Sequence, residues 1–226
     1  MAVVTISRQY ASGGDEIAAR VCELLEYQYF DKALMAEVAS EIGLSGDQIV
    51  DFSEDDYQVR GFLQRLLGRR ASPPPAQPGT QSPIGVATQP ARVEQLDEES
   101  SIRMVRATIE AAYEQGDVVI VGRGGQAILQ GKPGVLHVRI EAPLEPRVNR
   151  VRYREMQGLT AEFQLRSAQE RVGERDRATA AYLRRFFDID WADPSLYHLV
   201  IDTAKWGIEA GACLIASAVD CLPSTR

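Results

Sequence analysis

The chain has 226 residues, 45% of them hydrophobic, and a formal net charge of −7. This hydrophobic content suffices for a full core, and we expect a single domain over residues 1–226. The acidic balance argues against binding of nucleic acids or of anionic membranes, both of which need a basic surface. The sequence has three cysteines without metal-ligand spacing, starts without a basic and apolar leader, and lacks an apolar run of the roughly 20 residues that span a bilayer. We therefore expect a cytoplasmic protein.

Five short apolar runs have the character of β-strands, at residues 3–6, 27–30, 118–121, 135–140 and 198–201. Most are continuous rather than alternating, which is typical of strands buried on both faces of a parallel sheet. Between them, apolar residues recur every three or four positions at 17–25, 102–112 and 208–219. This alternation predicts a three-layer α/β fold whose ligands bind beyond the carboxyl ends of the strands.

The middle of the chain departs from this alternation. Residues 44–70 contain an apolar helical stripe and predict a small helical insertion on the acceptor side of the site. Residues 71–97 predict a Pro-rich flexible linker, because 71–91 hold six of the eleven prolines and no charged residue. An acidic patch then starts a helix that runs to Gln115. The apolar stripe at 62–67 permits a homodimer without requiring one.

The first strand is followed by a loop that ends in Ser12-Gly13-Gly14 and leads into a helix. This arrangement presents backbone N–H groups and the positive end of the helix dipole to a phosphate. The full phosphate-loop pattern has a lysine where this chain has Gly14. Arg8 either supplies the missing positive charge or is a solvated surface residue, and the loop itself is either a phosphate cradle or a plain turn.

Asp15 and Glu16 occupy the first turn of this helix. Two carboxylates there favour the helix dipole by about 0.3–1 kcal/mol each. Each would also repel a phosphate charge about 5 Å away by roughly 3 kcal/mol at an effective dielectric near 20. A bound Mg²⁺ reverses that sign, since carboxylates are its usual ligands. Either Glu16 helps to hold Mg²⁺, or this loop binds nucleotide weakly.

Arginines dominate the remaining candidates. Arg123 lies between two glycines at the end of the third strand, either facing a ligand in the cleft or incidental to a glycine-rich turn. Ten arginines and no lysine fall between 147 and 185. This composition suits a phosphate clamp on a lid over 147–187, while the alternative is a helix face joined by Glu–Arg pairs. The residues of interest there are Arg154, Arg171, Arg175 and Arg177.

Three further polar residues stand at strand positions. Asp31 follows the second strand and either contacts substrate or caps the next helix. His137 is expected to be a packed core histidine. Neither His137 nor His198 has a serine or cysteine partner at a recognisable spacing, so we do not expect a histidine-based nucleophilic mechanism.

Together these segments resemble the cytidylate kinase-like family, a branch of the P-loop nucleoside monophosphate kinases. The segments that carry the resemblance are ISRQYASGG at 6–14, YFDK at 29–32, VGRG at 121–124, HVRIEAP at 137–143, and WAD at 191–193 with YHLVIDT at 197–203. The resemblance covers most of the chain outside roughly 51–97. This chain departs from cytidylate kinases at Gly14, where they have lysine, and at Gly124, where they have aspartate.

The resemblance implies a P-loop NTPase-type fold with a five-stranded parallel sheet, ATP with Mg²⁺ as phosphoryl donor, and CMP or dCMP as acceptor. It implies that residues 12–16 (Ser12, Gly13, Gly14, Asp15, Glu16) hold the donor phosphates, that Arg123 holds the acceptor phosphate and that the stretch 171–177 is the lid. From the residues themselves we add Arg8 at the donor phosphates and Glu16 at the metal. We expect Asp31 and Arg154 to bind the acceptor together with Arg123, and Arg123, Arg171, Arg175 and Arg177 to neutralise the transferred phosphoryl group. The alternatives are a nucleotide-binding protein without turnover and a kinase for another small phosphate acceptor.

Overall fold

The computed structural model describes residues 1–30, 98–155 and 161–223. The predicted helical insertion at 44–70, the predicted linker at 71–97 and Asp31 lie outside these residues. The prediction of a homodimer also stays a prediction, because the apolar stripe on which it rests falls in the same segment.

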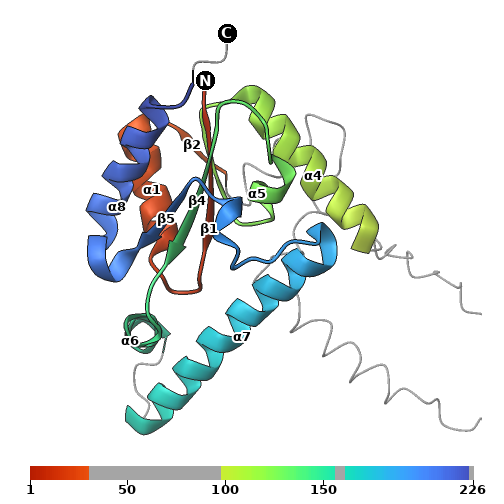
Figure 1. Cartoon of the computed structure of the whole chain (residues 1–226). Helices are drawn as coiled ribbons and strands as arrows, with labels where there is room; N and C mark the ends of the chain where they lie inside the picture. Colours follow the sequence, from red (N-terminus) through yellow and green to blue (C-terminus); the bar gives the residue numbers. More distant parts are fainter. Residues whose placement is uncertain (31–97, 156–160, 224–226) are drawn as a thin grey trace, which may run out of the picture.

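Five parallel strands form one sheet in the order β2-β3-β1-β4-β5. Their bounds are β1 (Val3–Arg8), β2 (Gln28–Phe30), β3 (Val118–Val121), β4 (Val135–Glu141) and β5 (Leu199–Asp202). The N-terminal strand is therefore the central one (Figure 1). Ile6 of β1 pairs with Val121 of β3 and with Val138 of β4. The loops that follow these three strands consequently leave the same edge of the sheet, next to one another.

All five strands predicted from the apolar runs are present. The inner strands β1, β3 and β4 are almost entirely buried, as expected for a sheet covered on both faces. The edge strands β2 and β5 are partly exposed, since each has a neighbouring strand on one side only. The last strand begins at Leu199, one residue later than predicted, although the backbone N–H of His198 still donates to the carbonyl of His137 at 2.7 Å.

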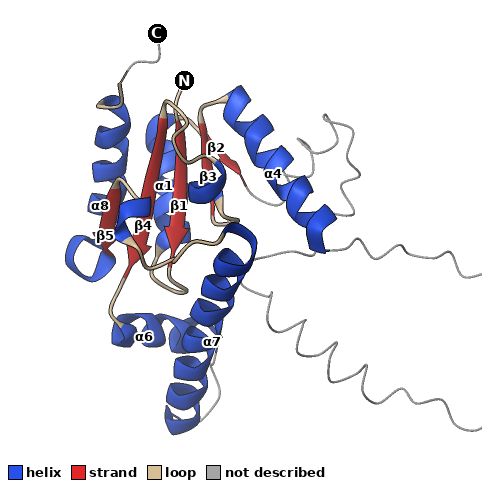
Figure 2. Ribbon diagram, turned by 45° about the vertical axis from the view of Figure 1, so that its right-hand side comes forward, coloured by secondary structure: helices blue, strands red, loops and turns tan. Residues whose placement is uncertain are grey.

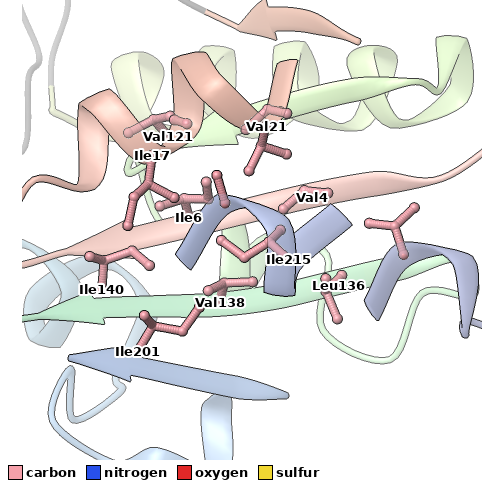
Figure 3. Close-up of a cluster of buried hydrophobic side chains, with 14 residues drawn as sticks. Val4, Ile6, Ile17, Val21, Val121, Leu136, Val138, Ile140, Ile201 and Ile215 are labelled. Atoms are coloured by element: carbon pink, nitrogen blue, oxygen red, sulfur yellow. The ribbon is translucent and has the colours of Figure 1, made fainter. Parts of the chain in front are cut away.

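Helices cover both faces of the sheet, which confirms the predicted three layers (Figures 1 and 2). On one face lie α1 (Gly14–Leu25) and α8 (Thr203–Asp220), and Ile17, Val21 and Ile215 pack on the central strands (Figure 3). On the other face lie α4 (Glu98–Gln115) and the short α5 (Gly125–Ile128). The apolar stripe of α4 is buried as its spacing predicts.

Two further helices, α6 (Leu144–Glu155) and α7 (Ala161–Phe187), lie near the carboxyl edge of the sheet (Figure 2). They pack on each other through a small apolar cluster of their own. It consists of Val148, Val151, Ala168 and Val172, against which the partly buried Tyr10 and Ala11 pack. We call this set the α6–α7 cluster. The polypeptide that follows β1 thus touches both helices.

Among the helices that the structure describes, none combines the length and the apolar character that crossing a membrane requires. Cys22, Cys213 and Cys221 are free thiols. Burial raises the pKa of the Cys22 thiol to about 11, so this group stays protonated at neutral pH.

Candidate phosphate-binding site

The loop between β1 and α1 forms one side of a hollow that is open to solvent. Residues 8–16, Val151 and Arg154 line it. The hollow therefore contains the whole predicted donor-phosphate loop together with one arginine of α6. Arg171, Arg175, Arg177 and Arg123 are not among its lining residues.

Carbonyl groups of three successive loop residues are held by side chains from outside the loop. The Tyr10 carbonyl accepts a hydrogen bond from Arg147 at 3.3 Å, and the Ala11 carbonyl accepts one from Arg150 at 3.0 Å. The Ser12 carbonyl accepts one from the hydroxyl of Thr203 at 2.6 Å. Each of these carbonyls therefore has a hydrogen-bond donor from another helix and does not have to find one in the hollow.

The first turn of α1 supplies donors to the hollow. The first four N–H groups of a helix have no partner within it, and they carry the positive end of the helix dipole. Gly13, the residue that precedes α1, has a φ of 91°, which a residue with a side chain rarely adopts. The hydroxyl of Ser12 is fully buried and has no hydrogen-bond partner within the described residues. A phosphate oxygen would satisfy both sets of donors.

Arg8 lies directly over Gly14, the residue at the position of the absent lysine. A Cβ on Gly14 would come within 2.5 Å of the Cβ of Arg8 and within 2.8 Å of its Cγ. Neither atom is the mobile end of the side chain, so position 14 has no room for lysine or any other side chain. The guanidinium of Arg8 instead lies at the hollow and donates from Nε to Asp15 at 3.0 Å.

Glu16 is paired with Arg154 of α6, across the hollow from the loop. This hydrogen bond raises the pKa of Arg154 above its ordinary value. Both acidic residues of the first turn are thus bound to arginines, an arrangement that the sequence analysis did not consider. Among the residues that the structure describes, no group of three or more His, Cys, Asp or Glu side chains could hold a metal ion. A metal contact of Glu16 stays a prediction.

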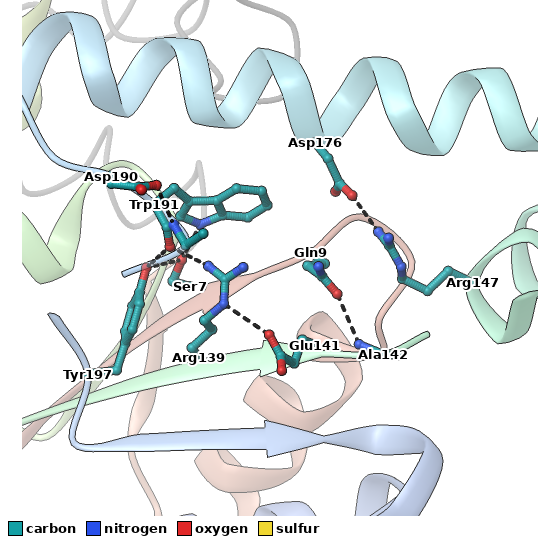
Figure 4. A network of polar contacts seen from close by, with 11 residues as sticks. Ser7, Gln9, Arg139, Glu141, Ala142, Arg147, Asp176, Asp190, Trp191 and Tyr197 are labelled. Atoms are coloured by element: carbon teal, nitrogen blue, oxygen red, sulfur yellow. Dashed lines mark hydrogen bonds and ion pairs between the residues drawn. The ribbon is translucent and has the colours of Figure 1, made fainter. Parts of the chain in front are cut away.

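Helix α7, which belongs to the predicted lid over 147–187, contacts the loop through two neighbouring residues. Asp176 accepts a hydrogen bond from the backbone N–H of Tyr10 at 2.9 Å. It accepts another from Arg147 at 2.6 Å (Figure 4). The guanidinium of Arg175 lies 5.7 Å from the centre of the Tyr10 ring. Arg171 and Arg177 are exposed on the same helix. Of the α7 arginines predicted to act on the phosphoryl group, Arg175 therefore lies at the loop.

A buried polar network fixes the end of β1 next to the loop (Figure 4). The hydroxyl of Ser7 accepts a hydrogen bond from the indole N–H of Trp191 at 2.7 Å. Arg139 donates to the Trp191 carbonyl at 2.5 Å and lies 4.6 Å from the centre of that ring. The side chain of Gln9 accepts from the backbone N–H of Ala142 at 3.0 Å.

His137 is a packed core histidine, as predicted. It is buried, its Nδ1 lies 2.7 Å from Oγ1 of Thr5, and its ring stacks on that of His198 at 5.2 Å. Burial, together with the neighbouring His198, lowers the pKa of His137 to about 4, so it is neutral at physiological pH.

Sequence reasoning missed the tethers of the loop, although one signal was available. Arg147, Arg150 and Arg154 are spaced three and four residues apart, which places them on one face of a helix. All three reach the loop or the hollow, whereas the general expectation for this stretch was a phosphate clamp or a set of Glu–Arg pairs. For Thr203, no local pattern indicates a contact with Ser12.

Comparison of the sequence with those of known proteins identifies the family of this chain. The sequence profile of the cytidylate kinase-like family matches residues 3–205. The chain belongs to the cytidylate kinase-like family. The cytidylate kinase of Methanopyrus kandleri is 31% identical over 117 residues, which cover 48% of this chain and 58% of that one. The cytidylate kinase of Methanocaldococcus jannaschii is 33% identical over 129 residues, which cover 56% and 66%. These matches span less than two thirds of either relative.

A solved structure shows a similar fold. The crystal structure of an uncharacterized protein from Eubacterium ventriosum has a TM-score of 0.61 at 18% identity and covers 97% of this chain and 99% of its own. At this identity the likeness concerns the fold alone.

The turn after β3 in this cytidylate kinase-like chain holds Arg123 in a left-handed conformation. Its φ is 58°, between 69° at Gly122 and 75° at Gly124. A Cβ on Gly124 would lie 2.5 Å from the ring of Phe187, the last residue of α7. The end of α7 therefore occupies the space that an aspartate at 124 would need, and this explains the glycine. Arg123 is partly buried at the same edge of the sheet as the phosphate loop.

Proposed function

We propose that this protein is a nucleoside monophosphate kinase that transfers the γ-phosphoryl group of ATP to CMP or dCMP, giving ADP and CDP or dCDP. The observation that carries the proposal is the position of Arg8 over Gly14. Arg8 supplies a fixed guanidinium at the phosphate loop, and its Cβ and Cγ fill the space that a lysine side chain at position 14 would need. Family membership over residues 3–205 supports the same reaction class.

The donor phosphates lie in the hollow at the start of α1. The N–H groups of the first turn and the hydroxyl of Ser12 bind their oxygens. Arg8 and Arg154 neutralise their charge, because a guanidinium binds phosphate with two parallel N–H donors. From the sequence we expected Arg154 to bind the acceptor, and we reassign it because it lines the same hollow as the loop. Arg154 is released from Glu16 when a phosphate takes the place of that carboxylate.

The acceptor phosphate binds at Arg123, which follows β3, the strand next to β1. An oxygen of that phosphate attacks the γ-phosphorus of ATP, and the bond from the γ-phosphorus to the bridging oxygen of ADP breaks. Arg175 of α7 lies over the ring of Tyr10 in the loop and stabilises the charge on the transferred group.

The residues present fit a magnesium ion bound together with the donor. Mg²⁺ is usually held by one or two carboxylates plus substrate phosphates, and Asp15 and Glu16 lie at the rim of the hollow. We assign Glu16 to this contact. When bound, the ion would neutralise charge between the donor oxygens.

The experiment that tests the proposal is a kinase assay with ATP, Mg²⁺ and a panel of nucleoside monophosphates, run beside a direct measurement of ATP binding. The variants are Arg8→Ala, Arg123→Ala and Arg175→Ala. The matched control is Arg184→Ala, since Arg184 is an exposed arginine of α7 whose side chain pairs only loosely, at 3.7 Å, with Asp188. We expect product with CMP or dCMP, a loss of about a hundredfold or more in each site variant, and no loss in the control.

ATP binding without product from any acceptor would favour the alternative, a nucleotide-binding protein that retains the fold without turnover. The two arginine–carboxylate pairs at the hollow are the observation that favours this alternative, because both pairs compete with phosphate. Product in the parent protein and equal turnover in Arg123→Ala and Arg175→Ala would refute the assigned roles. Absence of both binding and product would refute the proposed function altogether.

A further inference from the structure

Thr203, the first residue of α8, makes a buried contact with the phosphate loop. The residue is 4% exposed, and its hydroxyl donates to the carbonyl of Ser12 at 2.6 Å across 191 positions of sequence. The loop therefore receives a hydrogen bond from the far end of the chain, at the point where β5 ends and α8 begins.

Arg150 of α6 completes this contact. Its Nη1 donates to the Ala11 carbonyl at 3.0 Å, and both terminal nitrogens lie 3.4 Å from the hydroxyl oxygen of Thr203. The donors thus form a chain from the guanidinium of Arg150 to the Thr203 hydroxyl and on to the Ser12 carbonyl. Since hydrogen bonds in such a chain polarise one another, the charge of Arg150 strengthens the bond that Thr203 makes.

The loop needs to be held in place. Ala11 has a φ of 58°, a left-handed conformation that is unfavourable for any residue other than glycine. Such a conformation persists where the surroundings over-determine it. Here the carbonyls on both sides of this strained residue are fixed, by Arg147 at Tyr10 and by Thr203 at Ser12, and Arg150 fixes its own.

The geometry of the peptide unit between Ser12 and Gly13 gives the hydrogen bond from Thr203 a functional consequence. The carbonyl of Ser12 and the N–H of Gly13 belong to the same planar, trans unit, in which the two groups point in opposite directions. A hydrogen bond that fixes the Ser12 carbonyl toward α8 therefore also fixes the direction of the Gly13 N–H. That N–H belongs to the residue that precedes α1 and lines the hollow.

We propose that Thr203 and Arg150 are positioning residues, which hold the Ser12–Gly13 peptide so that its N–H points at a phosphate in the hollow. The proposal rests on the phosphate hollow of the proposed function and adds two residues that contact no substrate. Helix α8 thereby aligns the loop without lining the hollow.

The test compares Thr203→Val, which removes the hydroxyl at nearly constant size, with Thr203→Ser, which retains it. The readouts are the dissociation constant of inorganic pyrophosphate by calorimetry and the midpoint of thermal unfolding. The matched control is Thr108→Val, because Thr108 is also buried and its hydroxyl also donates to a carbonyl, that of Met104 at 2.7 Å within α4. We expect Thr203→Val to weaken pyrophosphate binding about tenfold or more, since an N–H to a charged acceptor is misaligned. Thr203→Ser should bind like the parent protein.

Thr108→Val should lower the unfolding midpoint and leave the affinity for pyrophosphate unchanged. Should Thr203→Val fail to fold, Arg150→Lys provides the second measurement, because lysine retains the charge and loses the fork that reaches two oxygens. Arg150→Lys is also expected to weaken pyrophosphate binding. A Thr203→Val or Arg150→Lys protein that is less stable but binds pyrophosphate like the parent would overturn the inference alone. A parent protein that binds neither pyrophosphate nor ATP would overturn the proposed function, and the inference with it.

Discussion

Replacement of Gly14 by alanine is the sharpest test of the arrangement at the phosphate loop. The added Cβ would lie 2.5 Å from the Cβ of Arg8 and 2.8 Å from its Cγ. Carbon atoms in favourable contact are about 3.5–4.0 Å apart, so one of the two segments has to move by about 1 Å. Overpacking of this kind costs about 1–3 kcal/mol. A strain-free Gly→Ala change has the opposite sign and stabilises by about 0.4–1 kcal/mol, so the clash decides the outcome.

We expect Gly14→Ala to lower the free energy of unfolding by about 1–2 kcal/mol and the unfolding midpoint by about 2–4 °C for each kcal/mol. Displacement of Arg8 should also weaken the binding of pyrophosphate. Gly14→Lys should share both losses rather than restore a lysine-type phosphate loop. The control is Gly173→Ala in α7, where the nearest atom to an added Cβ is the mobile Nη1 of Arg177 at 3.2 Å. The Gly173→Ala protein should be as stable as the parent protein or more stable.

The assays are urea unfolding and calorimetric titration of pyrophosphate on the same preparations. If Gly14→Ala were as stable as the parent protein and bound pyrophosphate equally well, Arg8 would not occupy the space that we assign to it. Higher phosphoryl transfer in Gly14→Lys would refute the reasoning in the same way.

Two further predictions concern the charged groups. Glu16→Gln releases Arg154 from its ion pair, and exposed pairs contribute about 0.2–1 kcal/mol. Without Mg²⁺, the Glu16→Gln protein should therefore bind pyrophosphate about two- to fivefold more tightly than the parent protein. The gain in ATP affinity that Mg²⁺ gives the parent protein should disappear in this variant. Weaker pyrophosphate binding in this variant without Mg²⁺ would contradict the competition between Glu16 and phosphate. For His137, burial and His198 lower the pKa from 6.5 to about 4, so the unfolded chain takes up this proton at a higher pH than the folded one. The stability that neutral His137 provides is complete above pH 6.5 and is lost as the pH falls toward 4, by at most about 1.4 kcal/mol per pH unit. In urea unfolding, the free energy of unfolding should fall less between pH 7 and pH 5 for His137→Gln than for the parent protein. An equal fall in both proteins would argue against the lowered pKa of His137.

The layers of the fold were predictable because they depend on local patterns. Each strand is a short apolar run, and the stripe at 102–112 of α4 is buried as its spacing of three and four residues requires. The position of the phosphate loop was predictable for the same reason, since strand, small residues and helix follow one another directly.

The partners of the loop depend on tertiary structure and were not predictable. Thr203 is 191 positions from Ser12, and nothing near either residue indicates the other. The sequence shows that Arg147, Arg150 and Arg154 share a helix face, but the target of that face depends on where α6 packs. The exclusion of lysine from position 14 depends on a turn with two left-handed residues, Ala11 and Gly13, which brings the chain back under Arg8. For Glu16 the sequence left two roles open, and the structure adds an ion pair with Arg154.

The separate α6–α7 cluster has a consequence for amide hydrogen exchange. The strand β1 is bonded on both sides in the middle of the sheet, so its amides should exchange only when the whole domain unfolds. Helix α6 and the part of α7 on which it packs contact the loop through a few small side chains and should open in a smaller, sub-global step. The C-terminal part of α7 is anchored separately, because Tyr182 and Leu183 are buried in a cluster with Ile102 and Trp191. That step removes Arg147, Arg150 and Asp176 from the loop at once, whereas the hydrogen bond from Thr203 to the Ser12 carbonyl is retained. Local melting of this pair would therefore abolish the anion site while the sheet beneath it stays folded.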